Sequence, residues 1–154
     1  MPNGKRHATA TLVVASCSFL TLALVCDVPT AIFTSLGCLA GLVLSCDLDV
    51  QAGSRSNHYV RKFAGIVVAA LWKTIWMPYA WAIPHRSVWS HGPIISTAIR
   101  LLYLGFLPAA FWWWAGWPLP RLETWMMWAV LGLVAADCTH ALLDWCDSKL
   151  GGRL

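Results

Sequence analysis

The chain has 154 residues, of which 58% are hydrophobic and only 12% charged, and 11 of them are tryptophan. A soluble domain carries about 25% charged residues, so this composition excludes an ordinary cytosolic protein and is typical of a membrane protein. The formal net charge of +4 comes from scattered lysines and arginines, which excludes a basic block of the kind that binds nucleic acid. We therefore expect a single membrane-embedded domain, residues 1–154, with membrane lipid and no nucleic acid as its partner.

Four long apolar stretches predict an all-α polytopic membrane bundle of about four transmembrane helices. A helix needs about 20 apolar residues to cross the bilayer core of about 30 Å. The first stretch follows Lys5 and Arg6, and only "CDVPT" separates it from the second, which indicates a tight helical hairpin. The expected spans are residues 9–25, 29–46, 94–117 and 124–143.

A fifth apolar segment, residues 63–83, contains Lys73, Trp76 and Pro78, a mixture typical of lipid headgroup depth. We expect this segment to be interfacial or re-entrant and not to cross. Both termini then share one side of the membrane with most of the lysines and arginines, and the positive-inside rule makes that side cytoplasmic. The tryptophans of residues 112–117 are expected to form an aromatic belt at the opposite face.

The six cysteines show no Cys-x-x-Cys pair, and most of them fall within apolar runs. Small hydrophobic cysteines are common in such runs, so we interpret them as packing residues. They are Cys17, Cys26, Cys38, Cys46, Cys138 and Cys146.

Histidines and acidic residues gather at the expected cytoplasmic ends of the spans. Ionisable residues at membrane depth are costly and typically functional. They come from four separate segments: His7 before the first span, Asp47 and Asp49 after the second, His85 and His91 before the third, and Asp137, His140 and Asp144 at the end of the fourth. This distribution predicts one shared site on one membrane face, from which we exclude His58 because it lies in a polar loop.

The spacing within the last span supports a metal site. Asp137, His140 and Asp144 stand at positions i, i+3 and i+7, so they share one face of a helix and can offer a metal both imidazole and carboxylate. In "CDLDV", Asp47 and Asp49 converge only if the backbone leaves the helix, which the polar "QAGSRSN" that follows indicates.

The stretch "HRSVWSHG" places two histidines six residues apart, which puts them on different faces of any helix. We expect His85 and His91 to approach each other in a folded-back loop, because Pro84, Gly92 and Pro93 surround them. The planar guanidinium of Arg86 suits a phosphate or carboxylate at the same place.

Together these motifs resemble a known family over most of the chain. A histidine before the first span, an Asp-x-Asp pair, "HRSVWSHGPI" and "HALLD" are similar to the LexA-regulated inner-membrane metal-dependent hydrolases and to a related group of uncharacterised membrane metal-binding proteins. The resemblance implies a bacterial inner-membrane location and seven metal ligands: His7, Asp47, Asp49, His85, His91, His140 and Asp144. Cys46 replaces the usual proline of the hydrolases, and the spacing of His85 and His91 is one residue longer, which favours the uncharacterised group.

Histidine and carboxylate ligands suit zinc, and also iron or manganese. Seven ligands exceed the four of one tetrahedral site and allow one or two ions, as used in phosphoester hydrolysis. We therefore expect a metal-dependent hydrolase acting on a lipid or lipid-linked phosphoester at the cytoplasmic face. Asp49 or Asp144 would accept a proton from water, and Arg86 would bind the anionic group.

Two other classes of function remain open. A non-catalytic membrane protein can use one fully coordinated metal ion to tie its helix ends together. A metal or ion transporter needs polar residues deep in its spans, where the sequence shows Arg100, whose long side chain can snorkel back to the interface.

Overall fold

The computed structural model describes residues 4–49, 54–85, 87–118 and 120–149, and the regular structure of these residues is entirely helical. The predicted all-α class is therefore confirmed. The elements are α1 (Gly4–Val25), α2 (Val28–Ala40), the 3₁₀ helix η1 (Cys46–Asp49), α3 (Arg55–Ala82), α4 (Val88–His91), α5 (Pro93–Trp114) and α6 (Thr124–Lys149).

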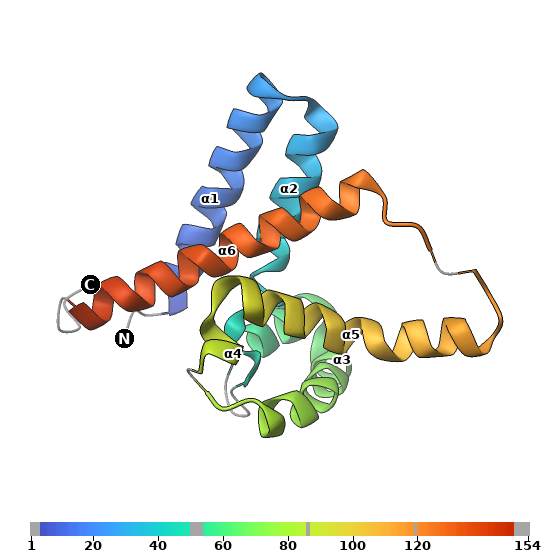
Figure 1. Ribbon diagram of the computed structural model, residues 1–154. Helices are drawn as coiled ribbons and strands as arrows, with labels where there is room; N and C mark the ends of the chain where they lie inside the picture. Colours follow the sequence, from blue (N-terminus) through green and yellow to red (C-terminus); the bar gives the residue numbers. More distant parts are fainter. Residues whose placement is uncertain (1–3, 50–53, 86, 119, 150–154) are drawn as a thin grey trace.

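Helices α1 and α2 form the expected hairpin, and α6 crosses both of its arms (Figure 1). The turn is fixed by Asp27, whose Oδ1 accepts a 2.7 Å hydrogen bond from the backbone N–H of Thr30 and so caps the start of α2. Pro29 stands in the first turn of the helix, where its missing N–H costs no intrahelical bond.

The contact between α2 and α6 depends on two glycines. A Cβ atom on Gly132 would lie 1.9 Å from the carbonyl oxygen of Thr34, and one on Gly37 would lie 1.9 Å from the carbonyl oxygen of Ala129. Backbone approach this close is possible only without side chains, as at the small-residue interfaces of membrane helices. It brings the end of α2 against the middle of α6.

Helix α2 is shorter than the expected span of residues 29–46. It has 13 residues, which cover about 20 Å and not the roughly 30 Å of a bilayer core. After Ala40 the hydrogen bonds tighten to the i→i−3 pattern, and the chain turns into η1. The backbone thus leaves the α-helix before Asp47 and Asp49, as predicted, but several residues earlier than expected.

Helix α3 bends back on itself at Gly65, which has a φ of +88°. Nε1 of Trp72 donates a 2.9 Å hydrogen bond to Oγ of Ser56, although 16 residues of straight helix would cover about 24 Å. Ser56 in turn donates to the carbonyl oxygen of Val43, just before η1. A positive φ is accessible to glycine at little cost, so Gly65 allows the two arms of α3 to fold together.

Four helices are long and apolar enough to cross a membrane, namely Lys5–Val25 within α1, and α3, α5 and α6. The expected number is therefore found, but α3 replaces α2, and α3 reaches the required length only when it is counted through its bend. Whether residues 63–83 stay on one side of a membrane remains a prediction, which the folded-back shape of α3 supports.

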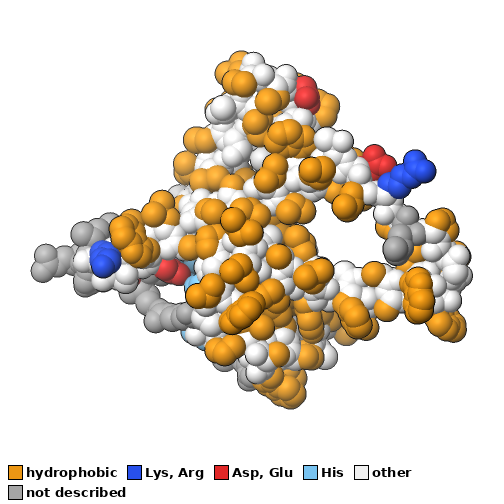
Figure 2. All heavy atoms as spheres, viewed as in Figure 1, with side chains coloured by type: hydrophobic (Ala, Val, Ile, Leu, Met, Phe, Trp, Pro, Cys, Tyr) orange, Lys and Arg blue, Asp and Glu red, His pale blue; other side chains and the backbone are white. Residues whose placement is uncertain are grey.

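Large apolar side chains cover the outside of the bundle. Figure 2 shows hydrophobic side chains over the whole visible face, with charged side chains confined to a few places. Leu24 is 86% exposed and Trp114 is 79% exposed, and similar exposure occurs along α3, α5 and α6. Lipid tails satisfy such a surface, whereas water does not.

An aromatic cluster holds η1 in place. Leu48 of η1 is buried against Trp76 and Tyr79 in the second arm of α3, and Tyr103 of α5 packs on the same cluster. The packing of Leu48 anchors the segment that carries Asp47 and Asp49 on either side of it. The aromatic residues of the fifth apolar segment therefore position the polar end of the bundle.

Arg100 does not snorkel to the interface. It is 1% exposed, and its guanidinium donates to the carboxylate of Asp137 and to the carbonyl oxygen of Leu44. Thr97 also donates to Asp137. Asp137 on α6 therefore neutralises the charge of a guanidinium that is buried on α5.

Candidate metal centre

The structure brings all seven predicted ligands into one contiguous cluster. They come from the first turn of α1, from η1, from the segment between α3 and α5, and from the second half of α6. The potential ligand atoms form three adjoining groups, within each of which they lie no more than 4.8 Å apart. The groups are Cys46, Asp47, His91 and His140; His7, His140 and Asp144; and Asp49, His85 and His91.

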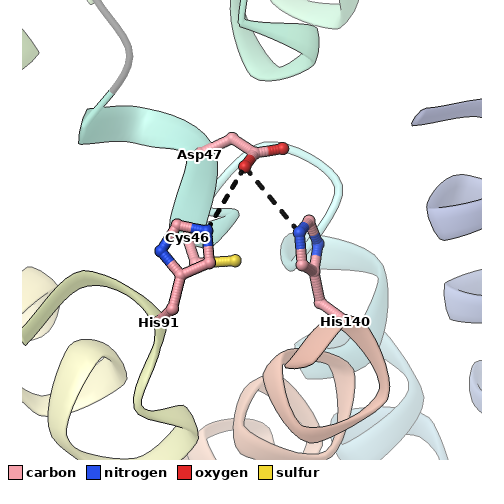
Figure 3. Close-up of side chains that lie close together, drawn as sticks. All are labelled: Cys46, Asp47, His91 and His140. Atoms are coloured by element: carbon pink, nitrogen blue, oxygen red, sulfur yellow. Dashed lines mark ion pairs between the residues drawn. The ribbon is translucent and has the colours of Figure 1, made fainter. Parts of the chain in front are cut away.

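The central group surrounds the carboxylate of Asp47. Oδ1 of Asp47 lies 3.7 Å from Nε2 of His140 and 3.8 Å from Nε2 of His91 (Figure 3). The two rings approach from different helices, α6 and α4. Asp47 therefore stands between imidazoles that no local sequence pattern connects.

The second group joins the two ends of the described chain. Nε2 of His7 lies 3.3 Å from Oδ1 of Asp144, and Nε2 of His140 lies 3.4 Å from Oδ2 of the same carboxylate. The rings of His7 and His140 stack with their centroids 3.8 Å apart. His140 and Asp144 are one helical turn apart on α6, so the predicted face of this helix supplies both.

The third group confirms that the histidine loop folds back. Nδ1 of His85 lies 2.9 Å from Oδ1 of Asp49, and Nδ1 of His91 lies 3.8 Å from Oδ2 of the same carboxylate. The Asp49 side chain is completely buried, whereas that of His85 is 43% exposed. His85 therefore stands at the outer edge of the cluster.

Two serines hold His91 in position. Ser87 caps the short helix α4 by accepting from the N–H of Ser90, and Oγ of Ser90 donates to the carbonyl oxygen of Pro84. Oγ of Ser90 also lies 2.9 Å from Nδ1 of His91. A hydroxyl that already donates elsewhere can accept from Nδ1–H, which leaves the lone pair of Nε2 directed toward Asp47.

Burial affects the protonation of His91 and Cys46 in the central group. Burial lowers the pKa of His91, and the carboxylates of Asp49 and Asp47 only oppose this effect. Burial also raises the pKa of the Cys46 thiol, and the neighbouring Asp47 raises it further. Without a cation, therefore, burial favours the neutral imidazole of His91 and the protonated thiol of Cys46.

The donor set fits a divalent metal. Oδ2 of Asp49 and Nδ1 of His7 are buried and make no hydrogen bond. A buried carboxylate oxygen without a donor is costly in a protein interior. The ion pairs of Asp47, Asp49 and Asp144 among the described residues are all with histidines. A cation among these three carboxylates would remove that cost.

A small, open pocket lies beside the cluster. Its wall combines His7, Asp47 and His140 with Arg55 and Tyr59 from the first arm of α3. An arginine next to potential metal ligands is suited to an anionic group that also contacts the metal. The pocket gives the cluster an accessible side.

Not every predicted site residue belongs to the cluster. Arg86, predicted to bind an anion, lies outside the described residues. His58, excluded from the predicted site, is exposed and belongs to none of the three groups. Asp137 shares the predicted face of α6 but pairs with Arg100 instead.

The sequence reasoning missed two residues of this site. The apolar surroundings of Cys46 in the sequence predict a packing residue, and its position directly before Asp47 is the one signal for a ligand. Arg55 gave no signal in the sequence, because its place at the pocket depends on the bend of α3 at Gly65. The bend itself was marked only by a single glycine within an apolar run.

No protein of curated function and no solved structure matches the chain. A family model described as "Uncharacterized metal-binding protein (DUF2227)" matches the chain, and this description agrees with the ligand-rich cluster. The model matches residues 2–122, which is more than half of the sequence, and the chain therefore belongs to this metal-binding family.

Proposed function

We propose that the protein is a metal-dependent hydrolase of a lipid or lipid-linked phosphoester, acting at the cytoplasmic face of a bacterial inner membrane. The observation that carries this proposal is the placement of three adjoining ligand groups beside an open pocket that contains an arginine. One structural ion needs about four ligands and no open side. The cluster offers more ligands than that, together with access.

The proposed ligands are the seven residues that the sequence predicted, and zinc, iron or manganese suits their nitrogen and oxygen atoms. The part of the chain that the family model matches, residues 2–122, includes five of these ligands and ends before His140 and Asp144. A bound divalent ion supplies Lewis-acid catalysis and charge neutralisation at a phosphoryl group. The relation to the LexA-regulated hydrolases remains a prediction from the resemblance.

Two aspartates are proposed to accept the proton of an attacking water. The Asp144 side chain is 36% exposed, so water reaches it, whereas Asp49 is buried and has one oxygen without a hydrogen bond. Either carboxylate can also serve as a ligand. Arg55 at the pocket and Arg86 in the histidine loop are the cations that we propose to hold the phosphate.

The surface of the molecule supports the proposed membrane location. Apolar side chains surround the helices, and the polar cluster lies where the beginning of α1, the end of α2 and both ends of α3 meet. A polar site at one end of an apolar bundle would lie at headgroup depth, where lipid phosphates are the nearest substrates.

The test is a screen of phospholipids and lipid-linked phosphates with metal-loaded protein in detergent or bilayers. We expect turnover by the wild type. Arg55→Ala and Arg86→Ala should each retain the metal but lose about 100-fold in turnover, equivalent to about 2.7 kcal/mol. Arg61→Ala is the matched control, because Arg61 lines a separate surface pocket with His58 and Lys62.

One other function has an observation in its favour. The ligands come from separate segments, so a single ion could tie the ends of the helices together without catalysis. If the metal-loaded protein hydrolyses none of the substrates and its ions have no exchangeable water, this structural function replaces the proposed one. The buried Arg100–Asp137 pair is closed by its own contacts and gives the transport alternative no support.

A further inference from the structure

Cys46 lies in the middle of the ligand cluster, a place that packing alone does not explain. It begins η1, is 2% exposed, and its Sγ lies within 4.8 Å of potential ligand atoms of Asp47, His91 and His140. In Figure 3 its sulfur atom lies between the rings of the two histidines. One sulfur, one oxygen and two nitrogen donors thus face a common point.

We propose that Cys46 is a thiolate ligand that makes the central group a cysteine, aspartate and two-histidine site for a thiophilic divalent ion such as zinc. Four donors of these types match the tetrahedral sites that zinc prefers. Sulfur ligation favours zinc over manganese or magnesium, which prefer oxygen. When the metal binds, the thiol proton is released to water and the sulfur–metal bond forms.

The hydrogen bond at the other ring nitrogen of His91 supports this arrangement. Its Nδ1 is engaged by Ser90, which leaves Nε2 on the side of Asp47 and Cys46. Metal-ligating histidines usually donate their other ring N–H to a protein oxygen in this way. The serine is completely buried and is itself tied to Pro84, so the ring orientation is fixed before any metal binds.

Oδ2 of Asp49, in the adjoining third group, is buried and accepts no hydrogen bond, which independently points to a cation in the cluster. Because His91 and His140 each belong to two of the three groups, an ion in the central group also neutralises the neighbouring carboxylates. The inference rests on the metal binding of the proposed function and not on hydrolysis. The proposal of hydrolysis and the proposal of sulfur ligation can therefore be refuted separately.

Cobalt replacement tests the proposal on the full chain in detergent. Cobalt(II) bound by a thiolate gives a sulfur-to-metal charge-transfer absorption in the near ultraviolet, which nitrogen and oxygen ligands do not give. We expect this absorption in the wild type and in Cys38→Ala, because Cys38 is equally buried but belongs to none of the ligand groups. Cys46→Ser should lose the absorption and bind cobalt at least about tenfold more weakly.

A second variant guards against a folding defect in Cys46→Ser. With Cys17, Cys26, Cys38, Cys138 and Cys146 all replaced by alanine, Cys46 is the one thiol left, and the absorption should remain. Absence of the band from cobalt-loaded wild type, or its survival in Cys46→Ser, would overturn the inference. A band without hydrolysis would refute the proposed function alone, and hydrolysis without a band would refute sulfur ligation alone.

Discussion

Two polar clusters lie one helical turn apart on α6, and their contacts are opposite in kind. Asp137 is buried in a pair with Arg100, and Thr97 and the carbonyl oxygen of Leu44 complete the contacts of the two charges. One positive and one negative group neutralise each other there. We call this the closed cluster.

The histidine–aspartate cluster contains three carboxylates whose ion-pair partners among the described residues are imidazoles. It leaves a carboxylate oxygen of Asp49 and a ring nitrogen of His7 buried without hydrogen bonds. Burial of charged residues alone therefore does not mark a functional site. The charges of the closed cluster neutralise each other, whereas the ligand cluster contains buried polar atoms that suit a cation.

The largest expected effect comes from opening the closed cluster. Asp137→Ala leaves the Arg100 guanidinium buried and unpaired, so we expect a loss of about 3–5 kcal/mol in the free energy of unfolding. Thermal or denaturant unfolding in detergent measures it. The double variant Arg100→Leu, Asp137→Leu should recover most of the loss. If Asp137→Ala instead lowered the metal content at unchanged stability, Asp137 would belong to the ligand cluster.

A smaller effect is expected at the α2–α6 contact, which supports both clusters. Gly132→Ala places a Cβ against the carbonyl oxygen of Thr34, so overpacking should lower the free energy of unfolding by about 1–3 kcal/mol. Metal binding should also weaken, because η1 would move away from α6. Gly105→Ala is the matched control, because a Cβ there meets nothing within 4 Å. Equal stability of the two variants would refute the close contact.

Within the ligand cluster, a substitution at the edge should weaken metal binding less than one at the centre. His85 belongs to one group and is 43% exposed, so His85→Ala should weaken metal binding about tenfold, or about 1.4 kcal/mol. His91→Ala should have the larger effect because His91 belongs to two groups. Titration with a metal indicator measures both affinities. An unchanged affinity in His91→Ala would remove His91 from the site.

The last prediction concerns the side of the membrane on which the two ends of α3 lie. Reporter fusions ending at Asn57 and Ser87 should place both residues on the cytoplasmic side, because Arg55 and His85 at the two ends of α3 both reach the cluster. Opposite sides would mean that α3 crosses the membrane, and would separate Arg55 from the histidine loop.

The sequence predicted the convergence of the ligands because they stand at helix ends, and the ends of antiparallel spans meet on one membrane face. It did not predict the closed cluster, because the pairing of Arg100 with Asp137 depends on how α5 and α6 rotate about their axes. The limits of α2 were also wrong at its end, since hydropathy continues through residues 41–45 while the backbone turns there. Cys46 shows the same limitation. Its residue type and its apolar neighbours in the sequence are typical of a packing residue, and only its neighbours in space indicate a ligand.

The central claim is that separate segments of one chain hold a metal at a shared site. Metal analysis of detergent-purified wild type beside the double variant His85→Ala, His140→Ala tests it most directly, with His58→Ala as the control. We predict one or two bound zinc or similar ions in the wild type and in His58→Ala, and a loss of most of this metal in the double variant. Equal metal content in all three proteins would contradict the claim.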